Sequence, residues 1–586
     1  MVTLTDEQKA FLDAEGKVVL RACPGSGKTF IVGKKLLKYL KTWPYAYRGI
    51  AVLSFTNVAS EEILRQTKQL AKTKIQNIGF PHFIGTLDSF INTFIFLRFG
   101  YLIYDDRKRP KIIYENFGKL RYPKRECYKN GCVGNLNWFH WSDNRLLKNG
   151  EPISCGVRTQ KPCISFKKAM LNKGYATQRE IPALSLRLLE KHPQIASEIA
   201  YRFPIIMVDE AQDTSREQMK IIELLAEKGT TSVIIVGDPD QAIYEWRDAT
   251  PEYFKRKLTD PQWNPLYLTA NFRSSQYICN ATAMFSAILS GKHPAEAKGK
   301  NADYGIKPVL LQVTPESTKK DVISWFKQLC AKNKINPDSN SVAILTRGKI
   351  YSNTEIPELW QTPETHLFAS ATYLWHCASR KKAYLQCERA LFDIMIGDAN
   401  GLSTEDIRQA IENIMDYSSW KHKVILILSL LPKANLALKD WKKQLIEIIE
   451  KLNQQKIISI FDSRKISDII KLKTRVKVNS SFSTEFLDKP LYMYFQKRTI
   501  KGTTFSSVHG VKGESFDATL LMVEGKSGNT ITPHLLNKGN LDSELMRIAY
   551  VAMTRPRKLL AVSIPKQKAK NALNRFPPEL WDYQEL

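Results

Sequence analysis

The chain has 586 residues, and its 87 Lys and Arg outnumber its 58 Asp and Glu to give a net charge of +29. At roughly 150 residues per domain, this length predicts about four domains or subdomains. Hydrophobic residues make up 43% of the chain, and no apolar run is long enough to span a bilayer, which argues against a membrane protein. The surplus of positive charge favours a polyanionic partner, with nucleic acid ahead of a membrane surface.

Two stretches carry most of the surplus of positive charge. Residues 98–191 contain 20 basic and 8 acidic side chains, and residues 421–501 contain 18 and 7. A solvated lysine-rich face would explain one such stretch, whereas two favour contact with a phosphate backbone. The nine cysteines show no disulfide spacing, and the polar N-terminal sequence MVTLTDEQKAFLDAEG has no signal-peptide pattern. We therefore expect a soluble protein in a reducing cytoplasm.

The first predicted element is a strand at Val18–Leu20, followed by the loop ACPGSGKT and a helix at Thr29–Leu40. Glycines let a backbone wrap around a phosphate, and a helix N-terminus supplies N–H groups and a favourable dipole. Lys28 is expected to reach the β- and γ-phosphates of ATP, and the Thr29 hydroxyl to bind Mg²⁺. The predicted nucleotide-binding loop comprises Ala22, Cys23, Pro24, Gly25, Ser26, Gly27, Lys28 and Thr29.

Further strands are predicted at Ile50–Leu53, Pro204–Val208, Ser232–Val236 and Leu266–Leu268, with a helix at Ala59–Ala71. This alternation predicts a parallel α/β sheet, whose ligands bind at the carboxyl ends of the strands. The strand at 204–208 ends in two carboxylates. Asp209 fits a magnesium anchor, and Glu210 fits the base that activates water.

Beyond residue 300, strands are predicted at Val309–Val313, Val342–Leu345, Phe505–Val508, Thr519–Val523 and Leu559–Val562. They indicate a second α/β sheet. Each sheet is interrupted by an insertion, and the second insertion is predicted to be largely helical because it contains periodic segments such as Leu436–Leu452.

Nine short strings occur along the chain in a set order: LTDEQ, ACPGSGKT, SFTNVASEEI, GTLDSF, VDEAQDTS, VGDPDQAIYEWRDA, LTANFRSS, SSVHGVKGESFDATLL and IAYVAMTRPR. With this set, the chain resembles the superfamily 1 DNA helicases of the UvrD/Rep/PcrA group from residue 4 to about 565, although both insertions match poorly. The resemblance implies two RecA-like parallel-sheet P-loop domains, each with a mainly helical insertion. The implied boundaries are 1–91 and 199–270 for domain 1A, 92–198 for the basic, cysteine-containing insertion 1B, 271–350 and 503–586 for domain 2A, and 351–502 for the basic insertion 2B.

The resemblance also assigns roles in ATP hydrolysis. Gln8 would read the adenine edge, since an amide both donates and accepts, and Phe272 would stack on the base. Gln241 would sense the γ-phosphate. Arg273 and Arg555 would be arginine fingers from the second sheet, so that hydrolysis would open and close a cleft between the two sheets.

The DNA contacts implied by the resemblance come from both sheets. Trp246 would stack on a base, as aromatic side chains do in single-strand channels, with Tyr244 and Arg247 beside it. A buried core position is the alternative for such a tryptophan. The remaining candidates are Phe55, Thr56, Asn57, Thr86, Ser89 and Phe90 in the first sheet and His509 and Lys512 in the second.

Two positions depart from the family pattern. Asp88 in TLDSF replaces the histidine of the usual TFHSF. In GESFD, which replaces the usual GLEFD, the glutamate lies one residue early, so the expected contact of Glu514 with the ribose is in question.

The cysteines raise two further hypotheses. Four of them cluster in the first insertion around His140, namely Cys127, Cys132, Cys155 and Cys163. Their C-x4-C and C-x7-C spacings differ from the tight C-x2-C pairs of common zinc sites, so reduced cysteines are preferred over a zinc or iron–sulfur site. Cys23, inside the phosphate loop, would make ATP hydrolysis sensitive to thiol oxidation if the Lys28 region lowered its pKa.

Together these inferences predict an ATP- and Mg²⁺-dependent helicase or translocase that moves 3′→5′ on single-stranded DNA, the direction being implied by the resemblance. An ATP-gated DNA sensor that recruits a partner nuclease, with little unwinding, is the alternative. A helicase–nuclease fusion is disfavoured because the chain ends about 20 residues after the last predicted strand. The compact length and the strings VKGESFDATLL and YVAMTRPRKLL are also similar to helicase subunits of Gabija anti-phage systems, which implies an OLD-like nuclease partner in anti-phage defence, with DNA repair as the other pathway.

Overall fold

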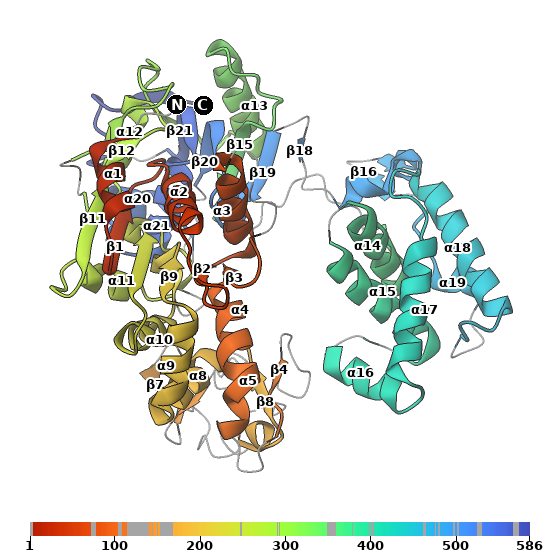
Figure 1. Ribbon diagram of the computed structural model, residues 1–586. Helices are drawn as coiled ribbons and strands as arrows, with labels where there is room; N and C mark the ends of the chain where they lie inside the picture. Colours follow the sequence, from red (N-terminus) through yellow and green to blue (C-terminus); the bar gives the residue numbers. More distant parts are fainter. Residues whose placement is uncertain are drawn as a thin grey trace. The chain divides into compact units, whose positions relative to one another are not determined.

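A computed structural model covers the 586 residues. It describes residues 4–71, 78–103, 108–113, 140–142, 145–148, 151–152, 168–245, 249–289, 291, 293–347, 359–377, 379–397, 399, 404–460, 465–474, 476–478, 481–495, 499–500, 503–523, 530–566 and 573–586. These residues form two compact units. The first contains two large β-sheets, and the second is built from residues between 351 and 498 (Figure 1).

The first sheet has six parallel strands in the order β11-β1-β10-β9-β2-β3. They are β1 (Lys17–Ala22), β2 (Ile50–Ser54), β3 (Phe83–Thr86), β9 (Ile205–Val208), β10 (Ser232–Gly237) and β11 (Asn264–Leu268). The central strands β2, β9 and β10 are buried along their whole length, because helices cover both faces. The carboxyl ends of all six strands therefore share one edge, where the loops after β1, β9 and β10 meet.

Two apolar cores lie on the two faces of this sheet. One contains side chains of α1 (Asp6–Asp13), α2 (Lys28–Lys41) and α3 (Asn57–Leu70). The other contains side chains of α8 (Ile181–Lys191), α9 (Pro193–Arg202) and α10 (Arg216–Glu227). Alternate residues of each strand enter the two cores, as the two-residue period of a β-strand requires.

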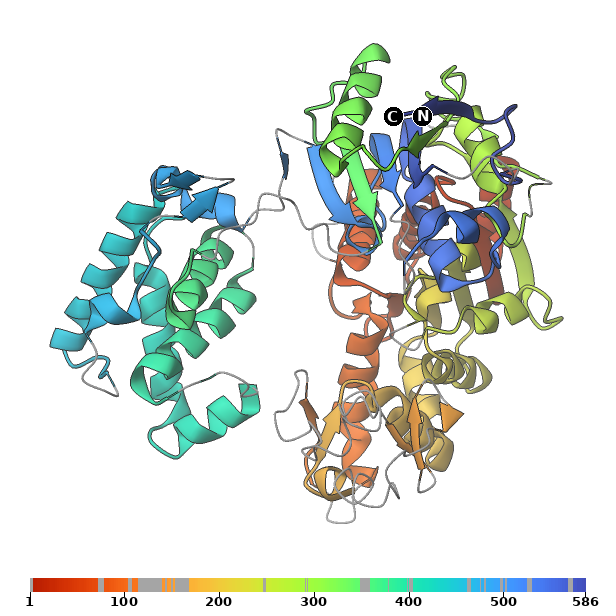
Figure 2. The same cartoon turned by 180° about the vertical axis from the view of Figure 1, so that it is seen from behind.

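The second sheet has seven strands in the order β18-β19-β15-β20-β21-β14-β22, all parallel except the short edge strand β18. They are β14 (Val309–Val313), β15 (Val342–Thr346), β18 (Thr499–Ile500), β19 (Thr503–Ser507), β20 (Phe516–Met522), β21 (Pro556–Pro565) and β22 (Asp582–Glu585). Helix α13 (Lys319–Lys332) covers one face, as Figure 2 shows from behind. Helices α12 (Gln276–Ala283) and α21 (Glu544–Met553) pack against the other face.

The ten strands expected from the sequence all correspond to strands of these two sheets, which confirms the α/β fold class. The sequence does not predict β3, β18 or β22. All three are edge strands. β18 has only two residues, and β3 and β22 are at most partly buried, so none of them has the continuous apolar run that marks a central strand.

Between β3 and β9, the described residues form helices together with short strands. Helix α4 (Leu87–Ile91) continues through η1 (Asn92–Phe96), α5 (Leu97–Phe99) and η2 (Gly100–Ile103). A two-stranded sheet joins β4 (Lys111–Ile113) to β8 (Tyr175–Thr177), and a three-stranded sheet consists of β5 (His140–Ser142), β6 (Arg145–Lys148) and β7 (Glu151–Pro152).

The second unit is mainly helical, as expected. It consists of α14 (Pro363–Cys377), α15 (Arg380–Met395), α16 (Thr404–Glu412), α17 (Tyr417–Leu430), α18 (Leu438–Gln454) and α19 (Ile466–Ile469), with a hairpin of β16 (Val476–Val478) and β17 (Ser481–Ser483). Trp420 and Trp441 lie fully buried in its core. Across the described part of the chain, no helix combines the length and the apolar character needed to cross a membrane.

Candidate ATP and DNA site

The phosphate loop between β1 and α2 contains two glycines in the left-handed region. The angle φ is 78° at Gly25 and 79° at Gly27. A Cβ atom at Gly25 would lie 2.5 Å from Asn271 Oδ1 and 2.8 Å from Arg273 Cβ. The Phe272 N–H donates to the Gly25 carbonyl at 2.8 Å. Glycine is therefore required at position 25 both by its backbone angle and by the close approach of the segment that leads into the second sheet.

The two acids that follow β9 lie beside the loop lysine. Lys28 Nζ is 2.6 Å from Glu210 Oε1 and 3.9 Å from Asp209 Oδ1. Burial alone would raise the pKa of Glu210, but the positive charges of Lys28 and Lys512 outweigh it and lower that pKa to about 2. Burial raises the pKa of Asp209 to about 6, although Lys28 opposes the shift. Glu210 is therefore the ionised partner of Lys28.

Two buried side-chain atoms here, Ser26 Oγ and Asp209 Oδ1, have no hydrogen-bond partner within the described ranges. A buried polar atom without a partner is costly unless a ligand or an ion satisfies it. Hydroxyl, carboxylate and lysine groups at a glycine-rich loop are the groups that phosphates and Mg²⁺ bind. The residues present, with Thr29 in the first turn of α2, thus fit both ATP and Mg²⁺.

A chain of hydrogen bonds leads from Glu210 to the second sheet. Gln212 donates from Nε2 to Glu210 Oε2 at 2.6 Å and accepts from the Asp238 N–H at 3.1 Å. Gln241 donates to Asp238 Oδ2 at 2.7 Å and accepts from Arg555 Nη2 at 3.0 Å. Three candidate catalytic residues thereby belong to one network. Gln212 and Asp238 are members that the sequence reasoning missed, although both lie inside the strings VDEAQDTS and VGDPDQAIYEWRDA.

The other candidate nucleotide contacts lie around this network. Arg273 donates from Nη1 to the Thr554 carbonyl at 2.9 Å. Gln8 donates to the Ser26 carbonyl at 3.4 Å and also completes the capping box at the start of α1. Glu514 is exposed, and its backbone carbonyl accepts a 3.5 Å hydrogen bond from Arg555. The structure therefore places the Gln8 side chain at the phosphate loop and the Glu514 backbone beside Arg555.

Candidate DNA contacts from both sheets form an aromatic cluster. The ring centroid of Phe55, after β2, lies 4.8 Å from that of Tyr244, after β10. The Tyr244 ring lies 5.7 Å from the ring of His509, in η10 (Val508–Val511) of the second sheet. Lys512 Nζ lies 4.8 Å from the Tyr244 centroid. Side chains far apart in the sequence thus meet beside the nucleotide network.

Lys512 connects this cluster to the nucleotide network. It donates to the Gln241 carbonyl at 2.9 Å and forms an ion pair with Asp213. Gln212 Nε2 lies 3.4 Å from the same Asp213 carboxylate. A displacement of Lys512 therefore changes the contacts of the residues that hold Glu210.

Two threonines among the DNA candidates cap helices. Thr56 Oγ1 accepts from the Ala59 N–H at 3.2 Å, and Thr86 Oγ1 accepts from the Ser89 N–H at 3.1 Å. Asn57, the first residue of α3, is exposed, as are the Ser89 side chain and its contact with Thr86. The four residues remain candidates for DNA contact because their side chains lie near solvent.

Asp88, which departs from the family pattern, has a hydrogen-bond partner in the structure. Gln218 donates to Asp88 Oδ1 at 2.7 Å, which ties α4 to α10.

The expected contact of Phe90 with DNA is wrong. Its side chain is fully buried in the core below the first sheet, where its ring contacts Phe83 and Phe203, so it cannot reach a DNA strand. Trp246, Arg247 and the cysteines at 127, 132, 155 and 163 lie outside the described residues.

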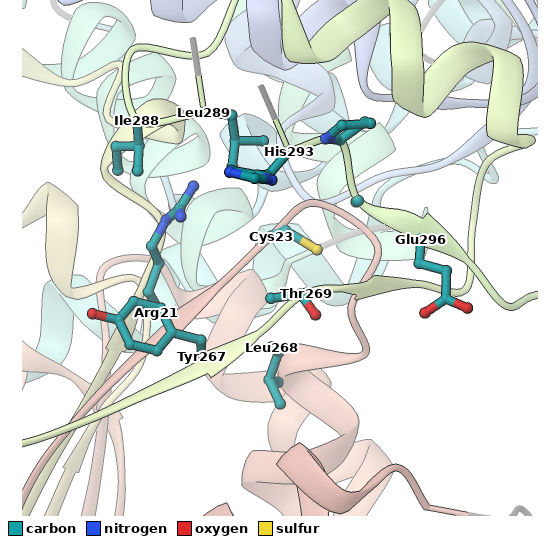
Figure 3. A pocket seen from close by; sticks show the side chains of 11 residues that line it. Arg21, Cys23, Tyr267, Leu268, Thr269, Ile288, Leu289, His293 and Glu296 are labelled. Carbon is teal, nitrogen blue, oxygen red and sulfur yellow. The ribbon is translucent and has the colours of Figure 1, made fainter. Parts of the chain in front are cut away.

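The expectation that the Lys28 region lowers the pKa of Cys23 is wrong. The thiol is buried, and burial raises its pKa, with the Asp238 charge acting in the same direction. A cavity of about 480 Å³ adjoins Cys23, walled by Arg21, Tyr267 and His293 among others (Figure 3). Lys28 and Thr29 do not line it, so it is separate from the place expected for the phosphates.

Two family models match the chain, the UvrD/REP helicase N-terminal domain over residues 4–262 and the UvrD-like helicase C-terminal domain over residues 405–567. DNA helicase II of Haemophilus influenzae is 27% identical over 296 residues, which are 47% of this chain and 39% of that protein. ATP-dependent DNA helicase PcrA of Staphylococcus epidermidis is 26% identical over 317 residues, which are 50% of this chain and 41% of that protein. The matched part thus spans about two fifths of the length of these relatives. With two parallel sheets and the ordered motifs around one network, the chain belongs to the UvrD-like helicases of superfamily 1.

Proposed function

We propose that the chain is an ATP-dependent DNA helicase or translocase that moves 3′→5′ along single-stranded DNA. The observation that carries the proposal is the unbroken path of contacts from Lys28 through Glu210 and Gln212 to Lys512 and the aromatic cluster. The ATP site and the candidate DNA contacts therefore share residues. The fourfold division into 1A, 1B, 2A and 2B is part of this proposal.

In the proposed reaction, ATP displaces Glu210 from Lys28. The lysine then turns to the β- and γ-phosphates, and the freed carboxylate orients and deprotonates the attacking water. Mg²⁺, held by Thr29 and Asp209, would neutralise phosphate charge. Lys28 and Glu210, the two groups that would act on the phosphate and on the water, thus lie within 2.6 Å of each other.

The second sheet completes the site. Arg555 and Arg273 would stabilise the charge that develops on the transferred phosphoryl group. Gln241 contacts Arg555 directly, so it can report the presence of the γ-phosphate to the second sheet. Phe272 and Gln8 would hold the adenine, and Glu514 remains a candidate for the ribose.

The DNA strand would run over the aromatic cluster of Phe55, Tyr244 and His509. Bases stack on such rings without sequence preference. Trp246 and Arg247 follow Tyr244 in the chain and would extend the path. The remaining proposed contacts are Thr56, Asn57, Thr86, Ser89 and Lys512.

A second candidate is an ATP-gated DNA sensor that recruits an OLD-like nuclease with little unwinding. The similarity to helicase subunits of Gabija systems motivates it and the proposed role in anti-phage defence, with DNA repair as the other pathway. Both candidates need DNA to reach the network through Lys512.

One experiment separates the candidates. ATP hydrolysis is measured with and without single-stranded DNA, and strand separation is then measured on 3′-tailed and 5′-tailed duplexes, with Lys28→Ala as the inactive control. A helicase that moves 3′→5′ is expected to separate the 3′-tailed duplex and not the 5′-tailed duplex. DNA-stimulated hydrolysis without separation would indicate the sensor, and hydrolysis that DNA leaves unchanged would contradict both.

A further inference from the structure

A group of exposed rings lies at the edge of the first sheet opposite the phosphate loop. It is formed by the loops that precede β2 and β3 and by the end of α9, which precedes β9. We call this group the aromatic–arginine patch. Its members are Trp43, Tyr45, Tyr47, Arg48, Phe80, His82, Tyr201 and Arg202.

Four rings of the patch are too exposed to serve the core. The exposed fractions are 76% for Tyr47, 74% for Phe80, 63% for Tyr201 and 43% for Tyr45. A ring that closes the end of a sheet would be largely buried, since burial is the source of its stabilisation. Four such rings gathered on one surface indicate a binding surface.

Two guanidinium groups lie against these rings. The Arg48 guanidinium carbon is 4.4 Å from the Tyr45 centroid and 4.5 Å from the Tyr201 centroid. That of Arg202 is 5.3 Å from the Phe80 centroid. The Phe80 and Tyr47 centroids lie 6.4 Å apart. Edge-to-face ring pairs and ring–arginine contacts therefore follow one another across the patch.

Backbone contacts hold the three segments together. The Gly49 N–H donates to the Arg202 carbonyl at 2.8 Å, and Arg48 Nε donates to the Tyr201 carbonyl at 2.8 Å. Arg202 Nη2 donates to the Pro81 carbonyl at 2.7 Å, and a Cβ atom at Gly49 would lie 1.9 Å from that oxygen. The patch is thus fixed before any ligand binds, which lowers the entropic cost of binding.

The charge of the patch is positive. Its members include two arginines and no carboxylate, and Arg98 is close enough that its charge adds to burial in lowering the pKa of Arg202. Arg202 Nη1 is buried without a hydrogen-bond partner among the described residues. A ligand with flat rings and regularly spaced negative charge fits this surface, and single-stranded nucleic acid has both.

We propose that the aromatic–arginine patch binds single-stranded nucleic acid, with bases stacked on Tyr47 and Phe80 and phosphates beside Arg48 and Arg202. The patch lies at the amino ends of the strands, whereas Phe55 follows the carboxyl end of β2. The length of that strand, roughly 15 Å, separates the two surfaces. The inference rests on the proposed function only in that the chain binds DNA. It adds a second binding site for a single strand.

The first test removes the two most exposed rings in a Tyr47→Ala/Phe80→Ala double variant of the full chain. Affinity for a dye-labelled oligothymidine of about 40 nucleotides is measured by fluorescence anisotropy. Each lost base stack is expected to weaken binding at least about fivefold. Hydrolysis of ATP without DNA and the thermal unfolding midpoint should not change. The matched control is Tyr267→Ala/Tyr277→Ala, which removes two exposed tyrosines elsewhere and should bind normally.

The second test maps photocrosslinks from oligonucleotides that carry 5-iododeoxyuridine. Adducts at Tyr45, Tyr47, Phe80 or Tyr201 are expected. Adducts confined to the cluster of Phe55 would overturn the patch proposal and leave the proposed function standing. A wild-type chain that binds no DNA would overturn both.

A third outcome would also overturn the proposal. If the double variant binds DNA normally but loses self-association in light scattering, the patch is a contact between copies of this chain.

Discussion

The ammonium group of Lys512 forms an ion pair with the carboxylate of Asp213, which ends η5 (Ala211–Asp213). One partner follows η10 of the second sheet, and the other lies three residues after Glu210 in the first. The pair is nearly withdrawn from solvent, with 10% of the Lys512 side chain and 1% of the Asp213 side chain exposed. Loss of either partner leaves a buried charge unpaired.

Removal of this lysine is expected to separate hydrolysis from DNA binding. In Lys512→Ala, DNA should stimulate ATP hydrolysis at least about tenfold less than in the wild type, because the link between the aromatic cluster and Gln212 is lost. The measurement is kcat with and without a saturating oligonucleotide. Lys566→Ala, which breaks the exposed pair with Glu585, is the control. Equal stimulation in Lys512→Ala and the wild type would show that the link runs elsewhere.

Removal of the loop lysine is expected to stop turnover. Lys28→Ala should lower kcat by at least about a hundredfold, since no other cation of the loop can reach the transferred phosphate. A coupled assay of phosphate release measures this. Lys38→Ala, on the same helix and paired with Asp13 at the surface, should hydrolyse ATP normally. Comparable rates in the two variants would contradict the assignment.

Gln212 is expected to act by positioning. Gln212→Ala should lower kcat by about ten- to a hundredfold while the KM for ATP changes by less than about threefold. The reason is that the fully buried Gln212 side chain holds Glu210 and Asp238 in place. Steady-state kinetics over a range of ATP concentrations distinguish the two parameters. A rise in KM at constant kcat would instead indicate a role in ground-state binding.

The second unit is expected to lose stability as the pH rises. Burial raises the pKa of Glu388, although Tyr384 and Tyr417 donate to its Oε1 at 3.1 and 3.0 Å. Above about pH 4.5 the unfolded chain releases this proton while the folded chain keeps it. The folded state therefore loses stability as the pH rises from there to the folded pKa, and the loss is complete at a pH above both values.

Glu388→Gln keeps the acceptor oxygen and removes this cost. The variant should be more stable than the wild type at pH 8, and the difference should vanish towards pH 4. Urea unfolding followed by tryptophan fluorescence measures it. Glu450→Gln, at an exposed position of α18, is the control. A variant that is destabilised more at pH 8 than at pH 4 would show that the carboxyl group is ionised in the fold.

The sequence predicts the central strands well because each is a short apolar run that ends in a glycine or a polar residue. It also predicts which strings lie at the carboxyl ends of those strands, so Glu210, Gln241 and Arg555 could be named in advance, whereas Gln212 and Asp238, which join them, could not. It does not tell which face of a short helix turns inward, which is why Phe90 is misassigned. The aromatic–arginine patch could not be foreseen. Its three segments lie far apart in the sequence and become neighbours only because β2, β3 and β9 are adjacent in the sheet.

The hydrogen bond between Phe272 and Gly25 is made by main-chain atoms alone. The phosphate loop is therefore fastened to the segment that leads into the second sheet by a bond that a change of the Phe272 side chain leaves in place. The ring at position 272 could therefore change during evolution to suit the adenine while the backbone hydrogen bond to Gly25 is kept. Only proline at that position, which has no N–H to donate, would cut it.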